Sequence, residues 1–231
     1  MTGTDTGVGK TVAACALVLA LRARGLRVAP MKPVAAGAVL RDGVWANGDT
    51  LALAAAAGPH APPLDAITPV LLREPVAPHI AAAREGRVID LDLLVAAHQR
   101  LAGQFDFTVV EGVGGFRVPL GASLDTVDLA RGLGLPVVLV VGLRLGCLNH
   151  ALLTADAIDR AGLALVGWIA DAIDPEMIAR DENVACLADR LPAPLLGLFP
   201  FAEYLAPSAT ADWVDVAPLL AHFERQFRPG G

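Results

Sequence analysis

Short apolar runs and longer stretches of helical periodicity alternate along the chain. Five runs rich in Val, Ile and Leu lack polar alternation, which is typical of strands buried on both faces; they span 27–30, 107–111, 137–141, 165–169 and 195–199. Helical periodicity marks 11–24, 91–101, 126–133, 148–161 and 176–191. This alternation predicts right-handed crossovers and an α/β fold: a doubly wound, mostly parallel sheet with helices on both faces.

One domain over residues 1–231 accounts for this pattern, because no shift in composition and no internal repeat divides the chain. The stretch 58–78 is punctuated by prolines and breaks the periodicity, so we expect a surface excursion there rather than a domain linker. We expect the tail 225–231 to fray.

Composition excludes several classes of protein. A net charge of −6 argues against a nucleic-acid or anionic-membrane surface, and 55% hydrophobic with 18% charged residues argues against global disorder. The longest uncharged apolar stretches, 12–21 and 133–143, are too short to span a membrane. The N-terminus lacks the features of a signal peptide. Because Cys15, Cys147 and Cys186 are widely spaced, we expect buried thiols in a reducing cytoplasm rather than disulfides or a zinc cluster.

A glycine-rich loop carries the strongest chemical signal. Residues 3–11 read G-T-D-T-G-V-G-K-T and lead directly into the first helical stretch. Glycines let backbone amides approach phosphate oxygens, Lys10 would reach the β- and γ-phosphates, and the Thr11 hydroxyl would ligate Mg²⁺. The strict pattern has glycine where this chain has Thr4, so the loop is a variant of the P-loop.

A phosphate loop normally follows a buried strand, and here only Met1 and Thr2 precede Gly3. Two interpretations stay open. Either the natural reading frame starts earlier, or the sheet forms with a short, weakened strand at this place.

Two carboxylates and a second lysine lie where strands or helices begin or end. Glu111 follows the apolar run 107–110 and precedes a glycine-rich loop, at the end of a strand where α/β sheets bind ligands. Asp49 starts a helix-like run, as a magnesium ligand or simply as a helix cap. Lys32 precedes Pro33, which marks the end of a strand, so we expect Lys32 to face the same crevice.

Together, several segments resemble the ATP-dependent dethiobiotin synthetase family. They run in order from residue 2 to residue 200: T-G-T-D-T-G-V-G-K-T (2–11), K-P-V-A-A-G (32–37), N-G-D-T-L-A-L (47–53), A-P-H-I (77–80), V-V-E-G-V-G-G (109–115), P-V-V-L-V-V-G-L-R-L-G-C-L-N-H-A-L-L-T (136–154), A-G-L-A-L-V-G-W-I-A (161–170) and P-A-P-L-L-G-L-F-P (192–200). Many NTPases share the phosphate loop, but L-G-C-L-N-H with K-P-V-x-x-G and E-G-x-G-G is far more specific.

The resemblance implies a cytoplasmic, homodimeric ligase of biotin biosynthesis. Such an enzyme uses Mg-ATP to close a ureido ring from 7,8-diaminononanoate and CO₂, through a carbamate and a carbamic-phosphoric anhydride, giving dethiobiotin, ADP and phosphate. Its partners would be these small molecules and a second subunit, with no nucleic acid and no membrane.

The resemblance also implies roles for individual residues. Lys32 and Lys10 would be catalytic, and Thr11, Asp49 and Glu111 would hold Mg²⁺. The nucleotide set comprises Gly7, Val8, Gly9, Lys10, Thr11, Val12, Asp49, Glu111, Gly112, Val113, Gly114, Asp171, Pro200, Phe201 and Ala202. The substrate set comprises Thr6, Lys32, Ala36, Pro78, Gly146, Cys147, Leu148 and Asn149, with the helix start at 146–149 binding the substrate carboxylate across the dimer interface.

Two departures from the family pattern matter. Ala36 stands where the family has Ser or Thr, which removes a hydroxyl expected to contact substrate. Asp171 stands at the position of an adenine-reading Asn, and a carboxylate lacks the amide's donor, which leads to the hypothesis of looser nucleotide choice.

Other classes fit less well. A partition-type P-loop switch has an extra loop lysine where this chain has Asp5, and a corrin-type amidotransferase synthetase usually needs a glutaminase domain. Cys147 and His150 lie on one helix without the turn that exposes a nucleophile. We interpret His150 and His79 as packed or hydrogen-bonded residues, with no proton-transfer role.

Overall fold

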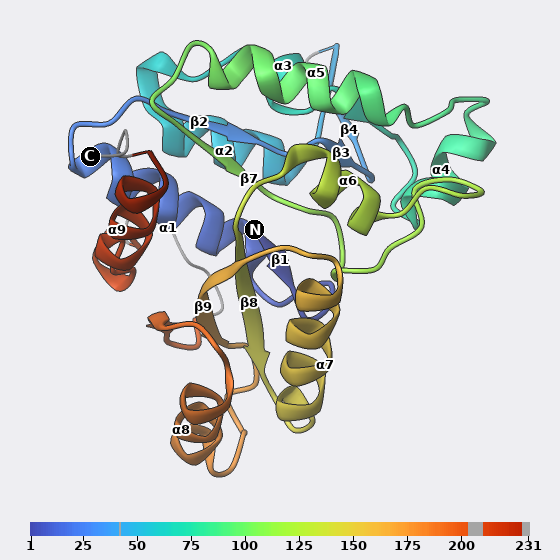
Figure 1. Ribbon diagram of the computed structural model, residues 1–231. Coiled ribbons are helices and arrows are strands. Elements are labelled where there is room, and N and C mark those ends of the chain that lie inside the picture. Colours follow the sequence, from blue (N-terminus) through green and yellow to red (C-terminus); the bar gives the residue numbers. More distant parts are fainter. Residues whose placement is uncertain (42, 203–209, 228–231) are drawn as a thin grey trace.

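The computed structural model describes residues 1–41, 43–202 and 210–227. Parallel strands form its centre (Figure 1): β1 (Thr2–Gly3), β2 (Val28–Met31), β7 (Phe107–Val110), β8 (Val137–Leu143), β9 (Leu165–Ala172) and β10 (Leu195–Phe199). The hydrogen-bonded orders are β1-β8-β9-β10 and β2-β7. Met1 joins them, because its nitrogen donates to the Val110 carbonyl at 2.6 Å and the Gly112 amide donates to the Met1 carbonyl at 2.9 Å. The continuous order is therefore β2-β7-β1-β8-β9-β10.

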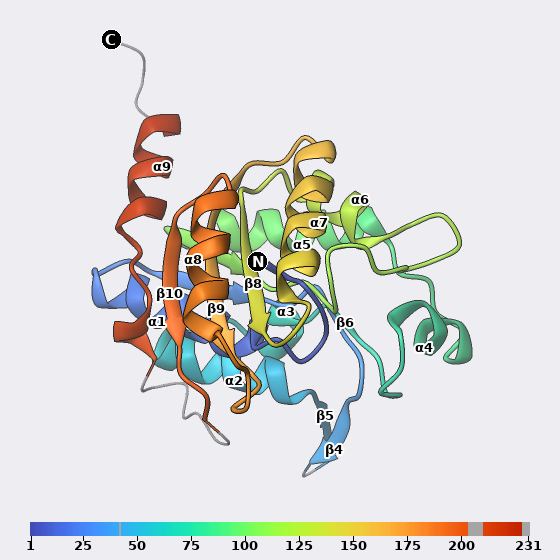
Figure 2. The same ribbon diagram turned by 90° about the horizontal axis from the view of Figure 1, so that it is seen from below.

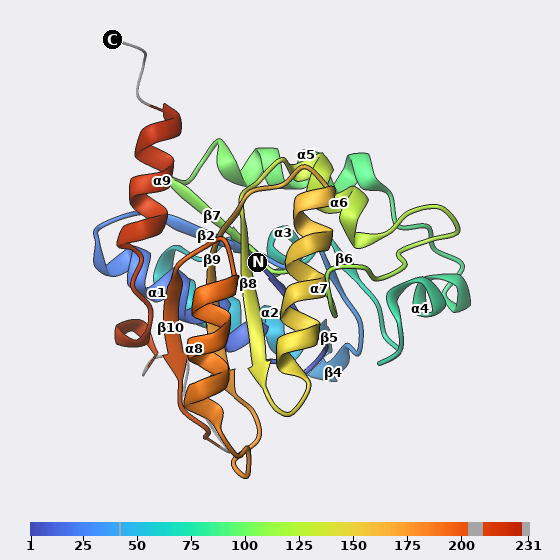
Figure 3. The ribbon, with the colours of Figure 1, turned by 60° about the horizontal axis from the view of Figure 1, so that its bottom comes forward.

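Helices cover both faces of this sheet. They are α1 (Lys10–Ala23), α2 (Gly48–Ala57), α3 (Leu64–Ile67), α4 (Pro78–Arg84), α5 (Leu91–Ala102), α6 (Thr126–Leu133), α7 (Cys147–Arg160), α8 (Arg180–Arg190) and α9 (Ala217–Phe227), with the 3₁₀ turns η1 (Gly58–His60) and η3 (Ala211–Trp213). Figure 3 shows α7 and α8 lying over β8 to β10. The predicted α/β class, with a doubly wound parallel sheet, is confirmed.

Alternate residues of the central strands explain the two layers. In β8, Val138 and Val140 pack into the cluster formed with α1 and α2, whereas Leu139 and Val141 pack against α7 and α8. In β9, Ile169 joins the first cluster and the fully buried Trp168 joins the second. Because both faces are apolar, these strands read as continuous hydrophobic runs in the sequence.

The strand before the phosphate loop is present but short. β1 pairs in parallel with β8, placing Gly3 opposite Val140, and the Thr4 amide donates to the Val140 carbonyl at 3.0 Å. In this chain the phosphate loop is therefore preceded by a two-residue strand.

The prediction of a surface excursion over 58–78 is wrong. Ile67 and Leu72 are fully buried, and β6 (Val70–Leu71) pairs in parallel with β3 (Val34–Ala35). The Ile67 carbonyl also accepts the amide hydrogen of Lys32 at 2.7 Å. The prolines therefore punctuate short buried elements that support the end of β2, rather than an exposed loop.

Two helix boundaries also differ from expectation. The stretch 176–191 begins as a turn, in which the Asp174 side chain accepts the Glu176 amide hydrogen and Ala179 has a φ of 56°, so α8 begins only at Arg180. α9 extends through Phe227, inside the tail expected to fray, and residues 228–231 lie outside the described part.

An antiparallel hairpin of β4 (Val39–Arg41) and β5 (Val44–Ala46), which the periodicity did not predict, projects from the body (Figure 2). No helix within the described residues is long and apolar enough to cross a membrane.

Candidate active site

The phosphate loop joins β1 to α1 and lines a cavity. Gly7 and Gly9 have φ values of 73° and 81°, which L-residues with a side chain rarely adopt. Gly9 is the N-cap residue of α1, and no side chain caps the helix, so its first amides stay available to an anion. A Cβ on Gly9 would lie 1.7 Å from an Asp171 carboxylate oxygen. Glycine is therefore required there both by conformation and by space.

The cavity beside this loop has a volume of about 1080 Å³. Its walls come from the phosphate loop, the start of α2, the segments 75–78 and 113–118, and one side of α7. Thirteen of the predicted residues line it: Thr6, Gly7, Gly9, Lys10, Thr11, Val12, Lys32, Ala36, Asp49, Pro78, Glu111, Val113 and Gly114. Residues from distant parts of the sequence thus meet at one edge of the sheet.

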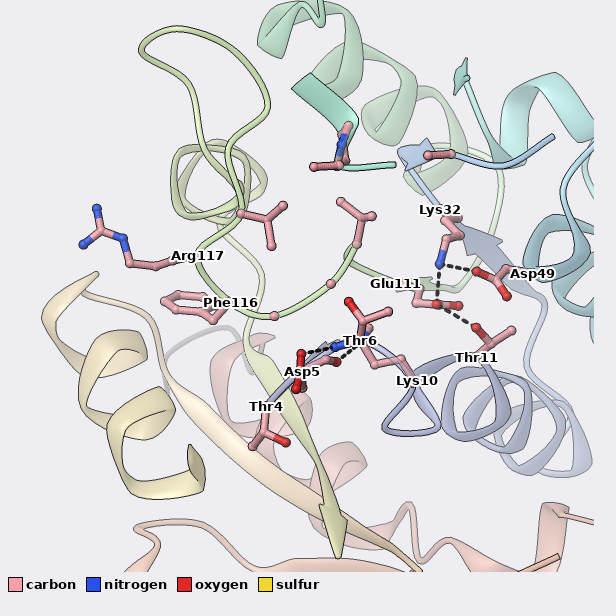
Figure 4. Close-up of a pocket in the computed structure, with 18 of the residues that line it drawn as sticks. Thr4, Asp5, Thr6, Lys10, Thr11, Lys32, Asp49, Glu111, Phe116 and Arg117 are labelled. Carbon is pink, nitrogen blue, oxygen red and sulfur yellow. Dashed lines mark hydrogen bonds and ion pairs between the residues drawn. The ribbon is translucent and has the colours of Figure 1, made fainter. Parts of the chain in front are cut away.

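Lys32 lies at the centre of a charged cluster (Figure 4). Its ammonium contacts Glu111 Oε1 at 2.6 Å and Asp49 Oδ2 at 2.7 Å. The Thr11 hydroxyl donates to the same Glu111 oxygen at 2.9 Å. Lys32 and Glu111 come from adjacent parallel strands, because each directly follows β2 or β7 and the Glu111 amide donates to the Met31 carbonyl. The sheet register therefore creates this contact.

Asp49 approaches the cluster from α2. The alternative interpretation of Asp49 as a helix cap is wrong, because Asn47 is the N-cap and its side chain accepts the Asp49 amide hydrogen at 2.9 Å. The Asn47 amide group also donates to the Ala36 carbonyl at 2.9 Å, which ties the helix to the segment after Lys32. With the cap position filled by Asn47, the Asp49 carboxylate is free to face Lys32.

Burial and charge oppose each other in this cluster. Burial raises the pKa of Glu111, whose side chain is 1% exposed, although the Lys32 charge and the Thr11 hydrogen bond lower it. Burial alone would lower the pKa of Lys32, but the charges of Glu111 and Asp49 outweigh it and raise that pKa. Burial lowers the pKa of Lys10 to about 8, against the attraction of Glu111. The cavity thus concentrates two lysines in a poorly solvated space, where they act strongly on an anion.

The donor set fits a magnesium ion bound together with phosphates. Within the described residues no group of three or more His, Cys, Asp or Glu side chains is placed to hold a metal. Thr11, Asp49 and Glu111 instead offer a hydroxyl and two carboxylates, and the buried Glu111 Oε2 has no hydrogen-bond partner. Because Mg²⁺ is usually bound through one or two carboxylates, with phosphates and water completing its shell, this set is sufficient.

Some predicted residues lie away from the cavity wall. Val8 and Gly112 belong to its supporting backbone, and the start of α7 does not line it: Gly146 and Asn149 are exposed, Leu148 is half-buried and Cys147 is 1% exposed. Further along α7, Leu153, Thr154 and Ala157 do line it. The buried Cys147 thiol is not placed as a nucleophile.

Asp171 and the segment 200–202 lie outside this cavity as well. The Asp171 carboxylate lies against Gly9, and Asp171 is only 6% exposed. Burial raises the pKa of Asp171 to about 6. Pro200, Phe201 and Ala202 are exposed and lead into residues outside the described part.

Sequence reasoning missed several residues of the wall. Phe116, Arg117 and Val118 follow the predicted glycine-rich segment, and Pro75 precedes the predicted Pro78. Their positions next to predicted residues are the signal that could have found them. Leu153 and Thr154 give no such signal, because only the packing of α7 decides which of its faces meets the cavity.

Known proteins resemble this chain in sequence and in fold. A family model described as an AAA domain matches residues 1–209. The ATP-dependent dethiobiotin synthetase of Aromatoleum aromaticum is 54% identical over 211 residues, covering 91% of this chain and 93% of the relative. The MinC:MinD cell division protein complex of Aquifex aeolicus (TM-score 0.57, 16% identity, covering 100% of this chain and 96% of that chain) is similar in fold. So is the cell division ATPase MinD of Pyrococcus furiosus (TM-score 0.54, 18% identity, covering 98% and 97%).

The two solved structures share less than a fifth of their residues with this chain, so they support a P-loop NTPase-like fold and nothing more specific. Sequence identity with the Aromatoleum protein is far higher and extends over nearly the full length of both chains. The chain belongs to the ATP-dependent dethiobiotin synthetase family.

Proposed function

We propose that this protein is a dethiobiotin synthetase: a ligase that uses ATP to close a ureido ring on 7,8-diaminononanoate with CO₂. The observation that carries the proposal is the single cavity that brings Lys32, between two carboxylates, beside the glycine-rich loop and Lys10. The sequence relative supplies the name of the reaction. The cavity supplies what that reaction needs, a phosphate cradle and a buried cation in one space.

The first steps make an anion from neutral reactants. One amine of the substrate attacks CO₂ and loses a proton, giving a carbamate. A carbamate oxygen then attacks the γ-phosphorus of ATP, forming an anhydride and releasing ADP. We assign to Lys32 the stabilisation of the carbamate and of the charge developing on it, because its ammonium is fixed in a space with little water.

The last step releases phosphate. The second amine attacks the carbamoyl carbon, the bond to the phosphate oxygen breaks, and the ring closes. Lys10 and the loop amides stabilise the negative charge on the oxygens of the departing phosphate. We further propose Mg²⁺ at Thr11, Asp49 and Glu111, where it supplies charge neutralisation to the nucleotide phosphates.

The substrate carboxylate needs a second binding site. The start of α7 fits this role by its unpaired amides, yet it lies off the cavity of its own chain. We propose a homodimer in which this segment serves the neighbouring subunit. Leu145, 93% exposed, lies just before the helix start, and Leu153, 60% exposed, lies further along α7; such contact would cover both.

Two inactive variants test the dimer. Lys32→Met disables the centre of one cavity and Asn149→Ala weakens the carboxylate site. If the two sites come from different subunits, refolding an equal mixture restores one competent site in each mixed dimer, and the mixture regains activity. A mixture as inactive as its parents contradicts the shared site.

We place the reaction in the cytoplasm, in keeping with the free thiols of Cys15, Cys147 and Cys186, which a reducing compartment preserves.

The function is tested by ADP release with Mg-ATP and bicarbonate, with and without 7,8-diaminononanoate, while dethiobiotin is followed by mass. We expect ADP to form only with the diamine and in a one-to-one ratio with dethiobiotin. Arg27→Gln is a matched control, because the Arg27 pair with Asp106 lies at the opposite ends of β2 and β7. ADP formation independent of the diamine overturns the proposal.

A further inference from the structure

An ion pair joins the phosphate loop to the segment that begins α7. An Arg144 guanidinium nitrogen lies 2.6 Å from Asp5 Oδ2, although the residues are 139 positions apart. Asp5 follows β1 and Arg144 follows β8, two adjacent parallel strands with Gly3 opposite Val140. The chain therefore leaves the sheet at the same edge in both places, and the ion pair links the two loops beyond the last strand contacts.

Asp5 is a point on which several parts of the phosphate loop depend (Figure 4). Its Oδ1 accepts the Thr6 amide hydrogen at 2.7 Å, and its backbone carbonyl accepts a hydrogen bond from the Lys10 ammonium at 2.6 Å. A displacement of Asp5 therefore moves the Thr6 backbone and the anchor of Lys10 together.

Asp5 is also an unfavourable residue for a loop that receives a polyphosphate. Its carboxylate lines the cavity and would repel the nucleotide if its charge were not compensated. The two side chains are 43% and 48% exposed, so the pair itself contributes little to folding stability. The main consequence of Arg144 is then electrostatic, because it cancels a negative charge next to the phosphates.

Arg144 also fixes the start of α7. Its backbone carbonyl accepts the amide hydrogen of Cys147, the first residue of the helix, at 3.0 Å. The same helix contributes Leu153, Thr154 and Ala157 to the cavity wall. One residue thus contacts the phosphate loop through its side chain and the start of α7 through its backbone.

We propose that Arg144 is a positioning residue that neutralises Asp5 and holds the phosphate loop in register with α7, so that nucleotide binding and diamine binding depend on one ion pair. The nucleotide half of this inference stands on the loop alone, and the diamine half rests on the function proposed above.

The test is a cycle of Arg144→Gln, Asp5→Asn and the double variant, with Arg27→Gln as the control for loss of a surface pair. The Asn retains an oxygen that accepts the Thr6 amide hydrogen, so it removes charge and little else. Calorimetric titration with a non-hydrolysable Mg-ATP analogue gives nucleotide affinity without turnover. Steady-state kinetics give KM for the diamine and kcat.

Arg144→Gln should weaken nucleotide binding about fivefold, because losing an exposed ion pair changes a binding constant by about this factor. The loss should shrink at high salt. The double variant should recover the affinity, because no unpaired carboxylate remains, but its KM for the diamine should stay raised with kcat little changed. Arg144→Lys should restore most of the nucleotide affinity.

Unchanged nucleotide affinity in Arg144→Gln overturns the inference, and so does a double variant that binds no better than Arg144→Gln. An equal loss of nucleotide affinity in Arg27→Gln also overturns the inference, because it indicates that losing any surface ion pair weakens binding through a general effect on stability. If the affinity cycle behaves as expected but the wild-type protein makes no dethiobiotin, the proposed function fails and the role of Arg144 in the loop stands.

Discussion

Replacing Lys32 by Met should destabilise the protein strongly, and the structure gives the size of the effect. The ammonium is lost from between Asp49 and Glu111, while Glu111 stays 1% exposed with the Thr11 hydroxyl as its remaining side-chain partner. Breaking a buried pair by removing one partner costs about 3–5 kcal/mol. In a chain of this length that corresponds to a fall in Tm of roughly 10 °C.

The pH dependence identifies the buried carboxylate as the cause. Burial already raises the pKa of Glu111, and the Lys32 charge that lowers it is gone in the variant. When a carboxyl group has a higher pKa in the folded than in the unfolded state, its ionisation destabilises the folded protein. At pH values below the unfolded-state pKa the group is protonated in both states and the free energy of unfolding is not reduced. The free energy of unfolding then falls as pH rises from the unfolded-state pKa toward the folded-state pKa. The penalty of Lys32→Met should therefore be small near pH 4 and larger at pH 8, because the share of ionised carboxyl grows as pH rises.

Urea unfolding at the two pH values measures this penalty. Lys32→Met/Glu111→Gln is the matched control, because it removes both charges at nearly constant volume and should recover most of the lost stability. The reasoning is refuted if Lys32→Met loses less than about 1 kcal/mol at pH 8, a loss within the range of an exposed ion pair. It is also refuted if the double variant is as unstable as Lys32→Met.

Four further predictions concern the rest of the site. Gly9→Ala should abolish binding of a non-hydrolysable ATP analogue in calorimetry, because its Cβ would overlap the Asp171 carboxylate. Gly25→Ala is the control, since Gly25 has a similar φ of 82° but no atom within 4 Å of an added Cβ, and this variant should bind the analogue normally. Equal binding by the two variants contradicts the steric role of Asp171. Asp49→Asn should raise the Mg²⁺ concentration for half-maximal ADP release severalfold, and an unchanged titration removes Asp49 from the ligand set. Asp171→Asn should be more stable than wild type by up to about 3 kcal/mol at pH 8 and not at pH 4, because the folded pKa of about 6 lies above the usual 3.8 and stability is lost between these values. Wild type should use CTP and GTP, relative to ATP, more readily than Asp171→Asn does. A strict preference of wild type for ATP contradicts this prediction.

Strands buried on both faces were the easiest part of the fold to predict. Their apolar runs, such as 137–141 and 195–199, reflect two helix layers; β10 has the predicted bounds and β8 extends two residues further, to Leu143. The strands missed, β3, β6 and the β4–β5 hairpin, have two or three residues each. A strand of that length has no measurable period, and its existence depends on partners that the sequence does not place nearby.

Local chemistry also explains which site residues could be predicted. Gly9, Lys10 and Thr11 are adjacent in sequence, so the local motif alone predicts that they lie together at the phosphate site. Arg144 carries no such pattern: its importance comes from the parallel pairing of β1 with β8, which brings it to Asp5. The pairing of Arg144 with Asp5 therefore stays hidden in a single sequence.

The phosphate loop is held by contacts on both sides of β1. Met1 bonds to β7 on one side, while Gly3 and Thr4 follow β8 on the other, so a segment of four residues is held from both edges. Beyond it, the Val8 side chain is 2% exposed, and a Cβ on Gly142 of β8 would lie 2.8 Å from Val8 Cγ1. The loop is thus fixed by the strand it leaves, by the valine it buries against β8 and by the Arg144 pair. Two of these three contacts come from β8 and the residue that follows it, so the loop geometry is set mainly by β8.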